Sequence, residues 1–309
     1  MQNNQTYVIG HKNPDADSIC SAIGLARLRG CTPARAGQLN RETEYILEYF
    51  GAEAPVLIED LSGLQVILVD HNKHHHAATG IDTANITEIV DHHFFGSDED
   101  LTAPVIRSEI LGSTAAIVCG MYEEAGIEPD KQTAGLLLGA IISDTLFFKS
   151  PNSTPIDKQV AEKLAAVAGV DLTDFAGKVL AAASDLSGKS VREIYYQDYK
   201  VFRGNGVSFG CGALTLAAGG DTSKLEEDIL SFMAGEPESI MLFMLTSLMD
   251  GRTTILCGSD LAAEVVREAY AGREEFFWTS DRTLRTNQIL SRKTQLVPQV
   301  TAAAEKIKL

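Results

Sequence analysis

The sequence predicts an α/β protein of two lobes. The first lobe is expected to hold a parallel sheet with helices on both faces, and the second, smaller lobe a mixed sheet. Short apolar runs alternate with helical stretches along the first half of the chain, and several of these runs end on aspartate or histidine. The chain has 309 residues, of which 45% are apolar, a size that suits about two domains.

The first lobe begins with a strand, a loop and a helix. Residues 5–9 are apolar and β-branched, residues 11–18 form a polar turn, and helical periodicity returns over residues 19–28. The units that follow repeat this pattern, since parallel strands need helical crossovers between them. Further strands are predicted at 65–69 and 86–90, and further helices at 41–50 and 113–126.

A buried helix is predicted near the end of the first lobe. Residues 132–148 are apolar almost all round, and helices of that character are normally buried. Two more helices, at 156–168 and 172–183, lead into a small polar stretch that suits a linker. We therefore expect an N-terminal domain at 1–187, a linker at 188–193 and a C-terminal domain at 194–309.

The second lobe is predicted to mix strands and helices. A closing helix is expected to start around Pro298, because proline is tolerated in the first turn of a helix. The other elements follow from apolar and amphipathic patterns in this half of the chain. Strands are predicted at 207–216, 240–248 and 253–257, and helices near 222–233 and 260–270.

Composition excludes several classes of protein. The net charge of −16 argues against broad nucleic-acid binding, which needs a basic surface. No apolar stretch is long enough to span a bilayer, and the N-terminus lacks the basic and apolar pattern of a secretory signal. The five cysteines form no CxxC pair, so we expect buried free thiols. A cytoplasmic protein that binds neither nucleic acid nor membrane is expected.

Potential metal ligands lie in four short polar segments, GHKNPDADS, VDH, VDHH and ISDT, each of which follows an apolar run. Because parallel strands end at one edge of a sheet, these side chains are expected to converge. A mixed set of nitrogen and oxygen ligands suits Mn²⁺ or Co²⁺, and the number of ligands favours a two-metal hydrolytic centre. The candidate ligands are His11, Asp15, Asp17, Asp70, His92 and Asp144.

A structural explanation competes for the first segment. Asp15, Asp17 or Ser18 could cap the helix that begins near Ile19. Aspartate and histidine recur at two further strand ends, which helix capping does not explain, so the metal interpretation is favoured. The run 74–76, three histidines, is interpreted as a surface loop, and the role of His71 stays open.

These segments resemble those of the DHH phosphoesterases and, more narrowly, of the family II, manganese-dependent inorganic pyrophosphatases. The resemblance covers His11 to Pro298. It implies an N-terminal DHH domain and a C-terminal DHHA2-type domain. It also implies hydrolysis of pyrophosphate to two phosphates, by in-line attack of a metal-bridging hydroxide in a two-metal site between the lobes. The matching segments are GHKNPDADSICSAIG, ILVDHN, EIVDHH, GLLLGAIISDTLFFKSPN and SRKTQLVP.

The resemblance also implies a role for each matching residue. His11 and Asp15 would hold one Mn²⁺, Asp17, His92 and Asp144 the other, and Asp70 would bridge both. His93 would face the substrate, while Lys200, Arg292 and Lys293 would bind phosphate oxygens. Mg²⁺ would arrive with the substrate, and a homodimer is expected. Ala16 and Ser18 stand where many relatives carry threonines, and 94–96 is less polar than in relatives.

Three other functions compete with pyrophosphate hydrolysis. A DHH phosphodiesterase acting on short oligonucleotides or cyclic dinucleotides would carry a glycine-rich segment with a histidine, which 211–213 and 218–220 lack. An exopolyphosphatase acting on short chains shares the same metal lobe. A non-catalytic metal or phosphate sensor has no need of His93 or of Arg292 and Lys293. The stretch from Asp70 to Asp91 is too short for an inserted regulatory module.

Overall fold

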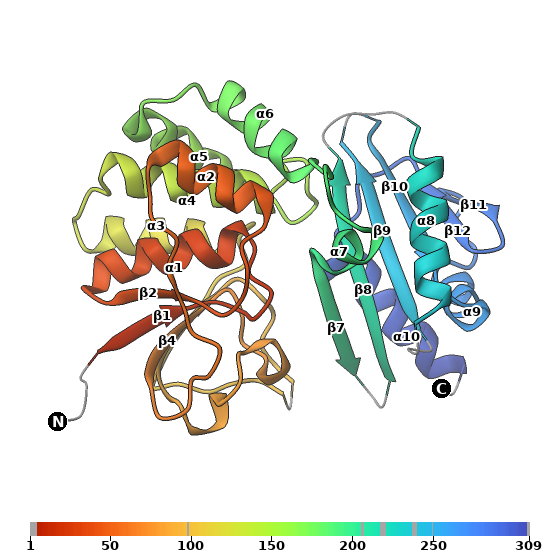
Figure 1. Cartoon of the computed structure of the whole chain (residues 1–309), viewed down its shortest axis with the longest axis horizontal. Coiled ribbons are helices and arrows are strands. Elements are labelled where there is room, and N and C mark those ends of the chain that lie inside the picture. Colours follow the sequence, from red (N-terminus) through yellow and green to blue (C-terminus); the bar gives the residue numbers. More distant parts are fainter. Residues whose placement is uncertain are drawn as a thin grey trace. The chain divides into compact units, whose positions relative to one another are not determined.

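The computed structural model describes residues 5–97, 99–204, 207–216, 221–236, 240–248 and 250–307. The chain divides into two compact units, 1–182 and 183–309, each with its own sheet. The first sheet is parallel and the second is mixed, so the predicted α/β class is confirmed. Figure 1 shows the helices and strands of both units. Among the described helices none is long and apolar enough to cross a membrane.

The first unit holds a six-stranded parallel sheet in the order β3-β2-β1-β4-β5-β6. The chain adds strands on one side of β1 and then returns to add β4 on the other side. This reversal places a topological switch point between β1 and β4, where crevices form at the carboxyl ends of the strands. The strands are β1 (Thr6–Ile9), β2 (Thr32–Arg35), β3 (Val56–Leu57), β4 (Gln65–Val69), β5 (Asn85–Asp91) and β6 (Val105–Ser108).

Helices α1 to α5 lie on one side of this sheet (Figure 1). Glycines allow close packing between them: a Cβ atom on Gly24 of α1 would lie 2.8 Å from Leu137 of α4. Likewise a Cβ on Gly139 of α4 would lie 2.7 Å from Ile46 of α2. The helices are α1 (Ala16–Arg29), α2 (Arg41–Phe50), α3 (Thr114–Glu124), α4 (Lys131–Asp144), α5 (Pro155–Ala168) and α6 (Leu172–Ala183).

The other face of the parallel sheet is covered mainly by loops and two single-turn 3₁₀ helices, η1 (His74–His76) and η2 (Ile81–Thr83). Sheet residues such as Leu68 and Ile89 pack there against Leu61 and Ile81. The helical cover expected on both faces is therefore reduced here to short turns. The segment between β4 and β5 forms the two 3₁₀ turns instead of an α-helix.

Helix α4 ends earlier than its apolar sequence predicts. We expected a helix through Phe148, but α4 ends at Asp144, and Leu146, Phe147 and Phe148 adopt left-handed φ values of 50°, 51° and 65°. The buried Thr145 holds this turn: its hydroxyl donates to the Ile141 carbonyl and accepts from the Phe148 amide. Apolar side chains after Asp144 thus mark a packed turn rather than more helix.

The second unit holds a six-stranded mixed sheet in the order β11-β12-β10-β9-β8-β7, in which only the β8 and β9 pair is parallel among the described residues. The strands predicted at 207–216, 240–248 and 253–257 correspond to β8, β9 and β10. The strands are β7 (Tyr199–Gly204), β8 (Val207–Leu216), β9 (Met241–Ser247), β10 (Arg252–Cys257), β11 (Phe276–Ser280) and β12 (Thr283–Thr286).

Helices cover both faces of the second sheet. Ile194 of α7 and Ile229 of α8 pack with Phe243 on one face. Val266 of α9 and Val300 of α10 belong to the core on the other face. The helices are α7 (Val191–Tyr196), α8 (Ser223–Ala234), α9 (Asp260–Ala269) and α10 (Val297–Ile307), and a π-helical turn η3 (Arg292–Leu296) precedes α10.

Candidate metal centre

Six polar side chains gather at the carboxyl edge of the parallel sheet. His11 follows β1, Asp70 follows β4 and His92 follows β5. Helix α1 brings Asp15, its N-cap, and Asp17, while Asp144 is the last residue of α4. These are the six ligands that the sequence predicts. Ligand atoms lie within 4.8 Å of one another in three groups: His11 with Asp15 and Asp70, Asp17 with His92 and Asp144, and Asp70 with His92 and His93.

Asp70 lies between two histidines. Its Oδ2 is 3.3 Å from His11 Nε2, and its Oδ1 is 3.5 Å from His92 Nε2. The residue is buried and has a positive φ of 59°, an uncommon conformation that aspartate tolerates better than most residues. Each carboxylate oxygen therefore faces a different histidine, an arrangement that allows one side chain to contact two ions.

Asp15 has two functions in the first group. One carboxylate oxygen, Oδ1, accepts the amide hydrogen of Ser18 and caps α1. The other, Oδ2, lies 3.3 Å from His11 Nε2. The helix-cap and the metal-ligand interpretations of the first polar segment are thus compatible, because each uses a different oxygen of the same side chain.

The second group is held by hydrogen bonds to main-chain atoms. His92 Nε2 lies 3.2 Å from Asp144 Oδ2 and 4.0 Å from Asp17 Oδ2. His92 Nδ1 lies 3.0 Å from the Leu111 carbonyl, so this nitrogen carries the proton and Nε2 offers its lone pair. Asp17 accepts the amides of Thr114 and Ala115 at the start of α3, at 2.7 and 2.9 Å.

The charges of the site favour cations. Burial, followed by the charges of Asp70 and Asp144, raises the pKa of Asp17 well above its usual value. Burial also opposes ionisation of Asp70, but hydrogen bonds with His11 and His92 outweigh it and hold its pKa well below the usual range. Asp144 ends a helix, where the dipole disfavours a carboxylate. Divalent cations would relieve all three conflicts, so the residues fit a metal centre.

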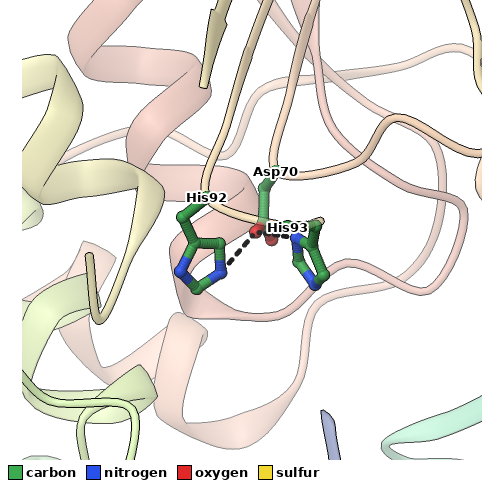
Figure 2. Close-up of side chains that lie close together, drawn as sticks. All are labelled: Asp70, His92 and His93. Atoms are coloured by element: carbon green, nitrogen blue, oxygen red, sulfur yellow. Dashed lines mark ion pairs between the residues drawn. The ribbon is translucent and has the colours of Figure 1, made fainter. Parts of the chain in front are cut away.

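His93 belongs to the third group, with Asp70 and His92, and is oriented by Asp91. Figure 2 shows His92 and His93 on either side of the Asp70 carboxylate, with His93 Nδ1 3.7 Å from Asp70 Oδ1. Asp91 Oδ1 accepts from the His93 amide at 3.0 Å and lies 2.7 Å from His93 Nδ1. Asn72 donates to Asp91 Oδ2 at 2.7 Å. Sequence reasoning missed these two partners, although both belong to the VDHN and VDHH segments.

The remaining histidines belong to no metal group among the described residues. His71 is buried, its Nδ1 lies 2.9 Å from the Val69 carbonyl, and burial lowers its pKa to about 4, so it is a neutral packing residue. The half-exposed His74 lies 2.6 Å from Asp82, and His75 lies 2.5 Å from Glu99. The run 74–76 therefore forms a 3₁₀ turn in the loop before β5, in which His74 and His75 pair with acidic side chains.

The predicted phosphate-binding residues lie in the second unit. Arg292 is anchored by the side chain of Asp198 at 2.6 Å and by the carbonyls of Asp198 and Cys211. Lys200 on β7 pairs in register with Cys211 on β8, and Lys293 follows Arg292 in η3. Arg292 and Lys200 thus both border Cys211. Asp198, which orients the guanidinium, was not predicted from the sequence.

Comparison with known proteins agrees with these motifs. Residues 5–141 match the DHH family, N-terminal domain, and residues 177–303 match the DHHA2 domain. A manganese-dependent inorganic pyrophosphatase of Methanothrix thermoacetophila is 36% identical, over 97% of this chain and 98% of its own length. A probable manganese-dependent inorganic pyrophosphatase of Clostridium acetobutylicum is 37% identical over the same shares.

Solved structures agree at the level of the whole chain. The crystal structure of a Methanococcus jannaschii protein assigned to the family II inorganic pyrophosphatases superposes with a TM-score of 0.87 at 34% identity, covering 97% of this chain and all of that one. An exopolyphosphatase-related protein of Bacteroides fragilis shares the fold, with a TM-score of 0.51 at 13% identity. Since the relatives match over nearly their full length, the chain belongs to the manganese-dependent, family II inorganic pyrophosphatases, hydrolases that combine a DHH and a DHHA2 domain.

Proposed function

We propose that this protein binds two Mn²⁺ ions at the carboxyl edge of its parallel sheet and hydrolyses pyrophosphate to two phosphates. The observation that carries the proposal is the position of Asp70, whose two oxygens face the imidazoles of two separate ligand groups. His11 and Asp15 would hold one ion, and Asp17, His92 and Asp144 would hold the other. Asp70 would serve both.

The donor set supports manganese. The two groups assigned to the ions each combine one imidazole with carboxylates, which suits Mn²⁺ or Co²⁺ better than Mg²⁺, whereas Mg²⁺ would arrive with the substrate phosphates. Such ions would supply acidification of water near neutral pH and neutralisation of phosphate charge. Side chains of the protein would bind the substrate and donate the proton to the leaving phosphate.

His93 is proposed to contact the substrate. Asp91 engages Nδ1 of the ring, so Nε2, the opposite ring nitrogen, is the one suited to donate to the leaving phosphate. Lys200, Arg292 and Lys293 are proposed to bind phosphate oxygens as charge develops in the transition state. The arginine fork recognises oxygens in pairs, and the lysines act as point charges.

The substrate test compares three phosphate compounds in the presence of Mn²⁺. We expect rapid phosphate release from pyrophosphate, and much slower release of phosphate from tripolyphosphate or of mononucleotide from a dinucleotide. Equal or faster turnover of the dinucleotide would replace this proposal with a phosphodiesterase. Tight Mn²⁺ binding without turnover of any of the three would identify a metal sensor.

We also propose a homodimer that forms through β6. This strand lies at one edge of the parallel sheet, and its Val105 and Ile106 are 52% and 45% exposed. Edge strands with apolar side chains pair readily with another chain. Sedimentation should show a dimer that Ile106→Lys converts to monomer, and a monomeric wild type would refute this.

The five free cysteines suit the proposed cytoplasmic location, because the cytoplasm keeps thiols reduced.

A further inference from the structure

Segment 111–115 links the start of α3 to three of the six proposed ligands. The Leu111 carbonyl lies 3.0 Å from His92 Nδ1, and the amides of Thr114 and Ala115 donate to Asp17. The Thr114 hydroxyl lies 3.3 Å from Asp70 Oδ1. A small displacement of this segment would therefore move ligands of both metal groups together.

Asp157 holds this segment from another element. The side chain lies in the first turn of α5, is fully buried, and accepts the Gly112 amide with both oxygens, at 3.0 and 2.9 Å. The fit is tight on two sides. A Cβ atom on Gly112 would lie 2.7 Å from Asp157 Oδ2 and 2.6 Å from Cγ2 of Thr145, the residue that follows Asp144.

Helix capping alone does not account for this arrangement. Asp157 also forms a capping box with Thr154, whose amide and hydroxyl both donate to Oδ2 at 2.7 Å. In the capping box of α7 an exposed residue, Glu193, forms the equivalent hydrogen bonds with Ser190. A carboxylate that only caps a helix gains nothing from full burial, which costs free energy unless several donors compensate. Here the additional donor comes from the metal-centre segment.

We infer that Asp157 is a positioning residue for the metal centre: it holds Gly112, and through it the segment 111–115 that aligns Asp17, Asp70 and His92. The inference rests on the proposed function, because it assigns those three side chains to bound Mn²⁺. Residues that orient metal ligands through hydrogen bonds typically change metal affinity by about 10- to 100-fold when replaced.

The test measures Mn²⁺ affinity of the metal-free full chain, by the electron paramagnetic resonance signal of free Mn²⁺, well below each variant's melting temperature. Asp157→Asn places an amide donor against the donors of Gly112 and Thr154, and should weaken Mn²⁺ binding by about tenfold or more. Thr154→Ala is the matched control: it removes the cap hydroxyl of α5 but keeps the Gly112 acceptor, and should change affinity less than about threefold.

A second variant keeps the inference testable if Asp157→Asn fails to fold. Asp157→Glu retains a residue that suits this position of a capping box but displaces the carboxylate by one methylene, so it should also weaken Mn²⁺ binding. Folded Asp157 variants with wild-type affinity, or a Thr154→Ala affinity lowered as much as theirs, would overturn the inference. Wild-type protein that binds Mn²⁺ but fails to hydrolyse pyrophosphate would refute the proposed function instead, and leaves the affinity comparison intact.

Discussion

The two units bury polar side chains in different ways. In the first unit the buried set includes the titratable residues His11, Asp17, Asp70 and His92, which contact one another at one edge of the sheet. In the second unit the buried polar residues of the strands are hydroxyls. Three neighbouring threonines form a row across β9, β10 and β12, namely Thr246, Thr253 and Thr286.

This difference distinguishes the residues of the candidate metal centre from those that only support the fold. A buried neutral hydroxyl costs less free energy than a buried charge, whereas neighbouring buried carboxylates also repel one another and oppose folding. Carboxylates therefore remain clustered only where another requirement outweighs stability. The ion pair of the second unit, the buried Glu226 with the partly exposed Arg285 at 2.7 Å, is balanced within the chain, but the cluster around Asp70 has more acids than bases. The comparison predicts that substitutions in the two units will fail in different ways.

The largest effect is expected for Asp70→Asn. Because Asp70 faces both ligand groups, its replacement by an amide should weaken the binding of both ions. Turnover of pyrophosphate should fall by at least ~10³-fold, a larger loss than removal of a single stabilising hydrogen-bond donor typically causes. Turnover and Mn²⁺ binding are measured side by side. The same substitution at the exposed Asp60, which caps a local turn, should leave both unchanged. An Asp70→Asn variant with most of its activity would show that the carboxylate is not shared.

Glu226→Ala tests the scaffold side of the comparison. Removing the carboxylate takes the hydrogen-bonded partner from the partly exposed guanidinium of Arg285, and should cost about 2 kcal/mol of unfolding free energy. Denaturant unfolding measures this loss, and Glu227→Ala, an exposed neighbour on α8, is the matched control. Mn²⁺ affinity should stay at the wild-type value. A Glu226→Ala variant that loses metal binding would break the distinction between the units.

The part of the fold that could be predicted follows from hydrophobic period. Segments 65–69, 41–50 and 172–183 were predicted with the bounds that β4, α2 and α6 have in the structure, because each shows a clear apolar run or a regular helical period. Strands β2, β3, β6, β7, β11 and β12 were missed. Pro33 argues against a strand inside a sheet, yet β2 pairs on both sides, so its assignment depends on neighbours rather than on its own residues.

The candidate site likewise has residues that the sequence predicts and residues that it does not. Aspartate and histidine in polar segments after apolar runs were enough to single out the six side chains of the two proposed ligand groups; three of the six follow strands, whose ends meet at one edge of the sheet. The partners that orient them could not be inferred. The sequence around Asp157 predicts only an ordinary helix cap, because its contact with Gly112 forms only when the chain is folded. The early end of α4 at Asp144 likewise depends on contacts of Thr145.

Lys293→Ala probes the contribution of the second unit to catalysis. If Lys293 binds phosphate oxygens in the transition state, its loss should lower kcat/KM for pyrophosphate by ~10²-fold and leave Mn²⁺ affinity unchanged. Lys306→Ala is the control, since Lys306 is an exposed residue of α10 that pairs with Glu268. A parallel loss of metal binding and activity in Lys293→Ala would refute the assignment of this lysine to substrate.

A smaller effect is expected for Asp91→Asn, which acts on the orientation of His93. The asparagine amide would face the side-chain amide donor of Asn72 or the ring of His93, so the bond that sets the imidazole is weakened. We expect kcat to fall by about tenfold, with Mn²⁺ affinity nearly unchanged because Asp91 belongs to neither ligand group. The pH profile of kcat should shift as well, since a carboxylate beside the ring favours its protonated form.

The matched control for Asp91→Asn is Asp130→Asn. Asp130 also accepts a main-chain amide, that of Thr133, but it caps the start of α4, whereas the proposed ligand Asp144 lies at the end of that helix. It should therefore lose a little stability and no activity. If both variants change kcat to the same extent without a shift in the pH profile, Asp91 serves only the fold. The first unit would then use this buried carboxylate for structure alone, as the second unit uses Glu226.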